Sequence, residues 1–156
     1  MWMEHTMPDR SPLVGTWRML TWQREFADTG ERIDGLGADP VGFVSYSDDG
    51  RVHAIVVKRD RRVPKSVPPS ANEKLALFDS MLAYAGTYTL HDDHVVHHLD
   101  ASWNQALTGT DQTRFYKLHG STLEISSAPA PDPFTGRTVV HRITFEKWVS
   151  RPSQSD

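Results

Sequence analysis

The chain has 156 residues, a formal net charge of −3 at pH 7 and no cysteine. This length fits one domain with a sizeable core, and the slight acidic excess argues against a nucleic-acid binder, which usually carries a basic surplus. Without cysteine the protein has neither disulfides nor thiolate metal sites. The composition therefore fits a reducing compartment, and we expect a cytoplasmic location.

The domain organisation follows from the two polar ends of the chain. Residues 1–12 contain two acidic residues and two prolines, unlike a secretory signal, and are expected to be a disordered leader. Residues 13–148 form the predicted domain, and 149–156 a polar tail. No apolar run reaches the roughly 18 residues of a transmembrane helix, so we expect no membrane association.

Alternating apolar and polar residues predict strands from the first segment onward. Residues 13–26 read as one long strand, with Trp17 and Met19 on one face and Trp22 on the other. Asp49 and Gly50 separate the strands predicted at 41–46 and 51–58, a strong hairpin signal. Further strands are predicted at 84–90, 94–103, 113–118, 123–127 and 139–148.

One helix interrupts this series of strands. It is predicted at about Asn72–Met81, with Ser70 or Asn72 as its cap, and should pack against or cap the rest of the domain. Its apolar stripe consists of Leu75, Phe78, Met81 and Leu82. About eight strands and one short α-helix predict an all-β fold, an antiparallel β-barrel.

Short motifs in a fixed order carry a resemblance to a known family. They are Leu13–Trp17 (LVGTW), Gly42–Tyr46 (GFVSY), Tyr84–Tyr88 (YAGTY), Val96 with His97, Gly109–Phe115 (GTDQTRF), Gly120–Leu123 (GSTL) and Phe145–Lys147 (FEK). Over residues 13–148 the chain resembles the small bacterial and fungal lipocalin-like domain proteins of the calycin superfamily. One departure is Lys147, where the family tends to have an arginine.

The resemblance implies a lipocalin-like barrel around a ligand cavity, with Trp17 plugging the closed end. It implies no reaction, although some relatives encoded beside natural-product pathways are thought to catalyse cyclisations or isomerisations. Lys147 is expected to lie over the Trp17 indole as an arginine would, with weaker stacking.

Aromatic and polar residues interleave in the strands and predict the ligand contacts. These contacts are Tyr46, Tyr84, Tyr88, His97, Trp103 and Arg114. Aromatic rings suit flat or hydrophobic ligands, and phenol hydroxyls add directional contacts. Barrels also need aromatics simply to fill their interiors, so a plain core role is an equal alternative.

His97 and Arg114 are the main polar candidates, because both fall in family motifs. A neutral imidazole in a dry pocket can exchange one hydrogen bond or serve as a general base. An inward Arg114 must be paired, with a ligand carboxylate or enolate as one option and an internal acid as another. An ordinary outward arginine is the third reading.

The remaining histidines predict no metal site. His97 and His98 are adjacent on one strand and therefore point to opposite faces, so solvated histidines are the favoured interpretation. A site built from His53, His97 or His98, and His141 is the less favoured alternative. No metal and no cofactor are expected.

Three functions are compatible with these residues. The leading hypothesis is binding of a small hydrophobic or aromatic molecule inside the barrel. The alternative is a cofactor-independent isomerase or cyclase acting on a conjugated carbonyl compound, with Arg114 holding an enolate and His97 or Tyr88 moving the proton. The third is a homodimer formed through an outer face, anchored by an exposed Trp22 or Trp148.

Overall fold

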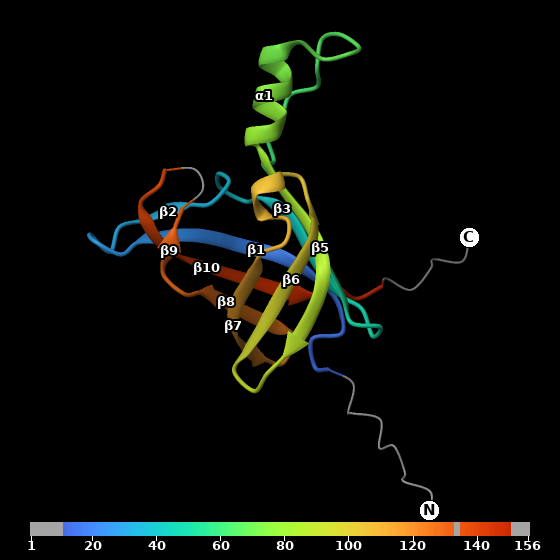
Figure 1. The fold of residues 1–156 in the computed structure, drawn as a ribbon, viewed down its shortest axis with the longest axis vertical. Coiled ribbons are helices and arrows are strands. Elements are labelled where there is room, and N and C mark those ends of the chain that lie inside the picture. Colours follow the sequence, from blue (N-terminus) through green and yellow to red (C-terminus); the bar gives the residue numbers. More distant parts are fainter. Residues whose placement is uncertain (1–10, 133–134, 151–156) are drawn as a thin grey trace, which may run out of the picture.

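A computed structural model describes residues 11–132 and 135–150, which form strands and one α-helix (Figure 1). The predicted leader, apart from residues 11 and 12, and the tail beyond residue 150 lie outside the described residues. The elements are β1 (Gly15–Phe26), β2 (Arg32–Asp34), β3 (Val41–Tyr46), β4 (Arg51–Val57), α1 (Ala71–Asp79), β5 (Met81–Leu90), β6 (His94–Ser102), a 3-10 turn (Gln105–Leu107), β7 (Asp111–His119), β8 (Thr122–Ser127), β9 (Ala130–Pro131) and β10 (Thr138–Lys147).

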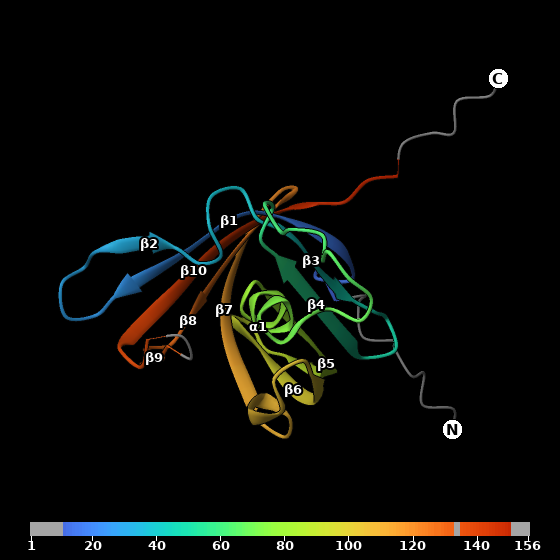
Figure 2. The same cartoon turned by 90° about the horizontal axis from the view of Figure 1, so that it is seen from above.

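Eight strands close into an antiparallel barrel, as the sequence predicted. Their order is β1-β3-β4-β5-β6-β7-β8-β10, and β10 pairs again with β1. The short strands β2 and β9 extend β1 and β10 outside this ring, and Figure 2 shows the ring from above. Closure leaves the interior faces of the eight strands turned toward one another, which creates the space for a site.

Trp17 is buried in β1, as predicted. Its side chain is 2% exposed, and its indole Nε1 donates a hydrogen bond to the carbonyl oxygen of Leu13 at 2.9 Å. Lys147 lies over the ring, which confirms the contact expected for the departure from the family motif. The plug therefore ties the first strand to the last.

A β-bulge in β1 corrects the predicted orientation of Trp22. The pairing with β10 shifts between Met19 and Thr21, so Leu20 is an extra residue in the strand. An extra residue reverses the alternation beyond it, and Trp22 lies inside the barrel at 5% exposure. The prediction of an outward Trp22 is wrong, and this residue cannot anchor a dimer, whereas Trp148 is 53% exposed.

Helix α1 stands beyond the rim of the barrel and does not pack along its wall (Figure 1). Ser70 caps it together with Glu73 in a capping box, and none of its residues is buried. The contact with the barrel rim is local: the Trp103 ring lies 5.7 Å from that of Phe78 and its Nε1 donates to the Phe78 carbonyl oxygen. Met81, predicted to end the helix, instead begins β5.

Among the described residues, no helix is both long and apolar enough to span a bilayer.

Candidate ligand-binding site

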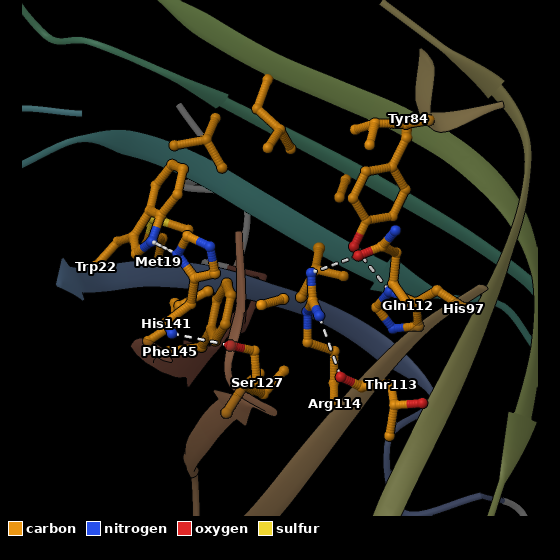
Figure 3. A pocket seen from close by; sticks show the side chains of 18 of the residues that line it. Met19, Trp22, Tyr84, His97, Gln112, Thr113, Arg114, Ser127, His141 and Phe145 are labelled. Carbon is orange, nitrogen blue, oxygen red and sulfur yellow. Dashed lines mark hydrogen bonds between the residues drawn. The ribbon is translucent and has the colours of Figure 1, made fainter. Parts of the chain in front are cut away.

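The interior of the barrel contains a cavity of about 450 Å³, shown in Figure 3. This volume lies within the range typical of small-molecule sites. Its apolar wall includes Met19, Trp22, Val56, Ile125, Ile143 and Phe145. Polar side chains interrupt this wall at a few positions, among them Tyr84, His97, Gln112, Arg114, Ser127 and His141.

His97 is held between two tyrosine hydroxyls. Its Nε2 lies 2.7 Å from Tyr46 Oη and its Nδ1 lies 2.7 Å from Tyr84 Oη. The three residues come from β6, β3 and β5, and we call them the Tyr46–His97–Tyr84 relay. Tyr84 and His97 line the cavity, whereas Tyr46 is 1% exposed and lies on the far side of the imidazole from Tyr84. Both ring nitrogens of His97 are thus engaged by hydroxyl groups.

Burial keeps the relay uncharged. Loss of hydration lowers the pKa of His97 to about 3, and the nearby Arg114 charge adds to this effect. Burial also raises the pKa of the Tyr46 and Tyr84 hydroxyls above the usual value. At neutral pH the imidazole is therefore neutral and both phenols are protonated.

Arg114 brings a positive charge to the cavity from β7. Its Nη1 donates to the carbonyl oxygen of Thr113 at 3.1 Å and its Nη2 to Gln112 Oε1 at 3.3 Å, as Figure 3 shows. In the described part of the chain, no carboxylate lies within ion-pair distance of Arg114. The hydrogen-bond partners of Arg114 among these residues are therefore neutral oxygens, while the Asp111 carboxylate, which lines the same cavity, pairs with His98.

His141 provides a second neutral imidazole from β10. The Trp22 indole Nε1 donates to His141 Nδ1 at 3.0 Å, and the backbone N–H of His141 donates to Ser127 Oγ at 2.9 Å. Burial lowers the pKa of His141 to about 4, again with a contribution from the Arg114 charge. The same charge thus acts on His97 and His141, which agrees with the central position of Arg114 in Figure 3.

The structure brings three of the six predicted contacts, Tyr84, His97 and Arg114, to the cavity wall. Tyr46 supports His97 without lining the cavity. Tyr88 packs edge-on against Tyr46 and donates its hydroxyl to the Ser47 carbonyl oxygen. Trp103 lies outside the cavity against Phe78. The pairing of β5 with β6 shifts between Ala85 and Gly86, so the alternation of β6 changes before it reaches Trp103.

The six predicted ligand contacts do not include Trp22, Gln112 and His141, which line the cavity. The bulge at Leu20 hides Trp22 from any strict alternation. A signal did exist for His141, because it alternates with Val139, Ile143 and Phe145 along β10, and odd-numbered residues of that strand face inward.

The alternative metal site does not form. His53 is exposed on the outer face of β4, and His98 pairs with Asp111 at 2.8 Å outside the relay. Within residues 11–132 and 135–150, no three histidine or acidic side chains converge as metal ligands would. Adjacent His97 and His98 do point to opposite faces, as predicted.

Comparison with known proteins identifies the family. The model of the lipocalin-like domain family matches residues 14–148. A crystal structure of a lipocalin-like protein from Bacteroides uniformis ATCC 8492 is 17% identical with a TM-score of 0.47, covering 87% of this chain and 98% of the other. An uncharacterized protein from Bacteroides eggerthii DSM 20697 is 15% identical with a TM-score of 0.45, covering 87% and 99%. No curated protein matches. Because the family model spans nearly the whole barrel, the chain belongs to the lipocalin-like domain family.

Proposed function

We propose that this protein binds a small hydrophobic or aromatic molecule that carries one anionic group, with the apolar body inside the barrel and the anion on Arg114. The observation that carries the proposal is the Arg114 guanidinium, which lines an apolar cavity and has no carboxylate partner among the described residues. A buried or half-buried cation gains most from an opposite charge. A ligand anion would supply it.

The neutral state of the two cavity histidines supports this reading. His97 and His141 both stay uncharged at neutral pH, so they add no second cation. A ligand with a single negative charge would therefore neutralise Arg114. A neutral hydrocarbon of the same size would use only the apolar wall.

The isomerase or cyclase alternative has weaker support. Both nitrogens of His97 are occupied by tyrosine hydroxyls, and its lowered pKa makes it a weak base. Tyr88, the other predicted proton carrier, lies outside the cavity lining. Arg114 lines the cavity, and this supports only the part of the alternative in which an arginine holds an anionic oxygen.

Isothermal titration calorimetry with two probes tests the proposal. Naphthoate carries a carboxylate, and ethylnaphthalene is a probe of similar size without one. We expect wild type to bind both, with naphthoate the tighter. Arg114→Met should lose about tenfold or more in affinity for naphthoate, the loss typical of a hydrogen bond to a charged group, and keep its affinity for ethylnaphthalene.

A filled cavity provides the matched control. Ala54 lines the cavity, so Ala54→Phe should abolish binding of both probes by occupying the space. Ala101 is exposed on the outer face, so Ala101→Phe should bind both as wild type does. If wild type binds neither probe, or if Ala54→Phe binds them unchanged, the proposal is wrong. If instead both probes bind as expected, native mass spectrometry of protein purified from its own source would identify the natural ligand.

A further inference from the structure

The hydrogen positions in the relay follow from the burial of Tyr46. Tyr46 is 1% exposed, and among the described residues the partner of its hydroxyl is His97 Nε2. If Nε2 carried the imidazole hydrogen, it would donate to Tyr46 Oη and leave the Tyr46 hydrogen without an acceptor. An unsatisfied buried donor costs about 1–3 kcal/mol. Tyr46 therefore donates to Nε2, which must be unprotonated.

An unprotonated Nε2 determines the state of Nδ1 on the same His97 ring. A neutral imidazole carries one hydrogen, so His97 holds it on Nδ1 and donates it to Tyr84 Oη. Tyr84 is then an acceptor from His97, and its own hydroxyl hydrogen is left for a second partner. Because Tyr84 lines the cavity, this hydrogen can be donated to a group bound there.

The position of the hydrogen on the His141 imidazole follows in the same way. An indole N–H can only donate, so Trp22 makes His141 Nδ1 an acceptor. The neutral His141 ring consequently carries its hydrogen on Nε2. No protein acceptor for this Nε2 hydrogen occurs in the described part of the chain.

Three residues of the cavity wall already accept a hydrogen bond from the protein. Asp111 pairs with His98, and Gln112 Oε1 accepts from Arg114. Ser127 Oγ accepts the backbone N–H of His141. Tyr84, Arg114 and His141 therefore offer donors to the cavity, and each of these three acceptor residues already has one partner in the protein.

We infer that the cavity recognises the carboxylate of a hydrophobic or aromatic acid through a set of donors, with Tyr84 as a direct contact whose hydrogen is oriented by Tyr46 through His97. The inference rests on the proposed function and deepens it by assigning the ligand's polar group. A carboxylate only accepts hydrogen bonds, and its two oxygens can engage a phenol and a guanidinium together. Tyr46 and His97 are positioning residues in this arrangement.

Nitrogen-15 NMR of the histidine side chains tests the relay without any ligand. We expect wild-type His97 to carry its hydrogen on Nδ1. Tyr46→Phe removes the donor to Nε2 and should lower the fraction of the Nδ1–H form. Tyr88→Phe removes a hydroxyl from the ring that packs on Tyr46, and that hydroxyl is bonded to Ser47, so it should leave the tautomer unchanged.

Calorimetry with naphthoate and ethylnaphthalene tests the recognition. Tyr84→Phe should weaken naphthoate binding about tenfold, as expected for a lost hydrogen bond to a charged group, and leave ethylnaphthalene binding unchanged. Tyr46→Phe should show the same selective loss to a smaller degree, although Tyr46 does not line the cavity. Tyr88→Phe should bind both probes as wild type does.

The outcomes separate this inference from the proposed function. If Arg114→Met loses naphthoate selectively while Tyr84→Phe and Tyr46→Phe bind it as tightly as wild type, the proposed function stands and the relay inference is overturned. An Nε2–H tautomer in wild-type His97 overturns it as well. If neither probe binds wild type, the proposed function fails and takes the ligand assignment with it, whatever the tautomer.

Discussion

The Nζ atom of Lys147 lies 4.8 Å from the centre of the Trp17 ring and donates a hydrogen bond of 2.6 Å to the carbonyl oxygen of Val14. Trp17 and Lys147 are also direct partners in the ladder between β1 and β10. One side chain thus covers the indole, satisfies a backbone carbonyl and joins the two strands that close the barrel. A cation over an indole face is attracted by the ring electrons.

The first prediction concerns this closed end. Trp17→Ala should lower the free energy of unfolding by about 3–5 kcal/mol, because it empties a fully packed position. Lys147→Met should cost less, about 1–2 kcal/mol, through the cation contact and one hydrogen bond. Urea denaturation measures both. Trp148→Ala is the control, since this neighbouring tryptophan is half exposed; a loss below about 0.5 kcal/mol for Trp17→Ala would show that Trp17 is no plug.

Stability should fall on mild acidification because of the two cavity histidines. The folded-state pKa values of His97 and His141 are about 3 and about 4, below the ordinary value of 6.5. Between the folded-state pKa values and pH 6.5 the unfolded chain binds more protons than the folded one. The stabilisation is thus fully present above pH 6.5 and is lost as the pH falls toward the folded pKa values.

The measurement is urea denaturation at pH 7, 6 and 5. Each histidine contributes a slope of up to about 1.4 kcal/mol per pH unit in this window. His97→Gln should remove the contribution of one histidine to this slope, and so should His141→Gln. The double variant should remove both contributions. An unchanged slope in both single variants would mean that neither imidazole is held neutral.

A third prediction tests the close approach of β5 to β6. A Cβ atom added at Gly86 would lie 1.9 Å from the backbone oxygen of His98, where no flexible side chain can yield. Gly86→Ala should therefore cost about 3 kcal/mol or more through overpacking. Gly120→Ala is the control, because its surroundings are open and only its positive φ of 61° opposes alanine, at a cost of about 1–2 kcal/mol. Equal losses in thermal or urea unfolding would contradict the clash.

The projecting helix gives a fourth prediction. Leu75 is 60% exposed on α1, so Leu75→Ala should change the free energy of unfolding by less than about 0.5 kcal/mol. Leu123, fully buried in β8, is the matched comparison, and Leu123→Ala should cost about 2–5 kcal/mol. A large loss for Leu75→Ala would show that the helix packs on the barrel in solution.

The strands of the barrel and their turns could be predicted because their causes are local. Alternation needs only neighbouring residues, and the Asp49-Gly50 turn forms from its own backbone preferences. The capping of α1 by Ser70 has the same local origin. The family motifs then placed Trp17 at the closed end and singled out His97 and Arg114, both of which reach the cavity.

The tertiary structure decided which side chains meet in the cavity. The bulge at Leu20 arises where β1 must pair with β10, more than a hundred residues away, and it turns Trp22 inward onto His141. Tyr46 and His97 are 51 residues apart and meet only because the barrel closes. Sequence by itself determined the eight strands of the barrel, since these depend on short-range preferences, but it did not predict the short strands β2 and β9. The polarity of the cavity depends on contacts between distant strands that no local pattern records.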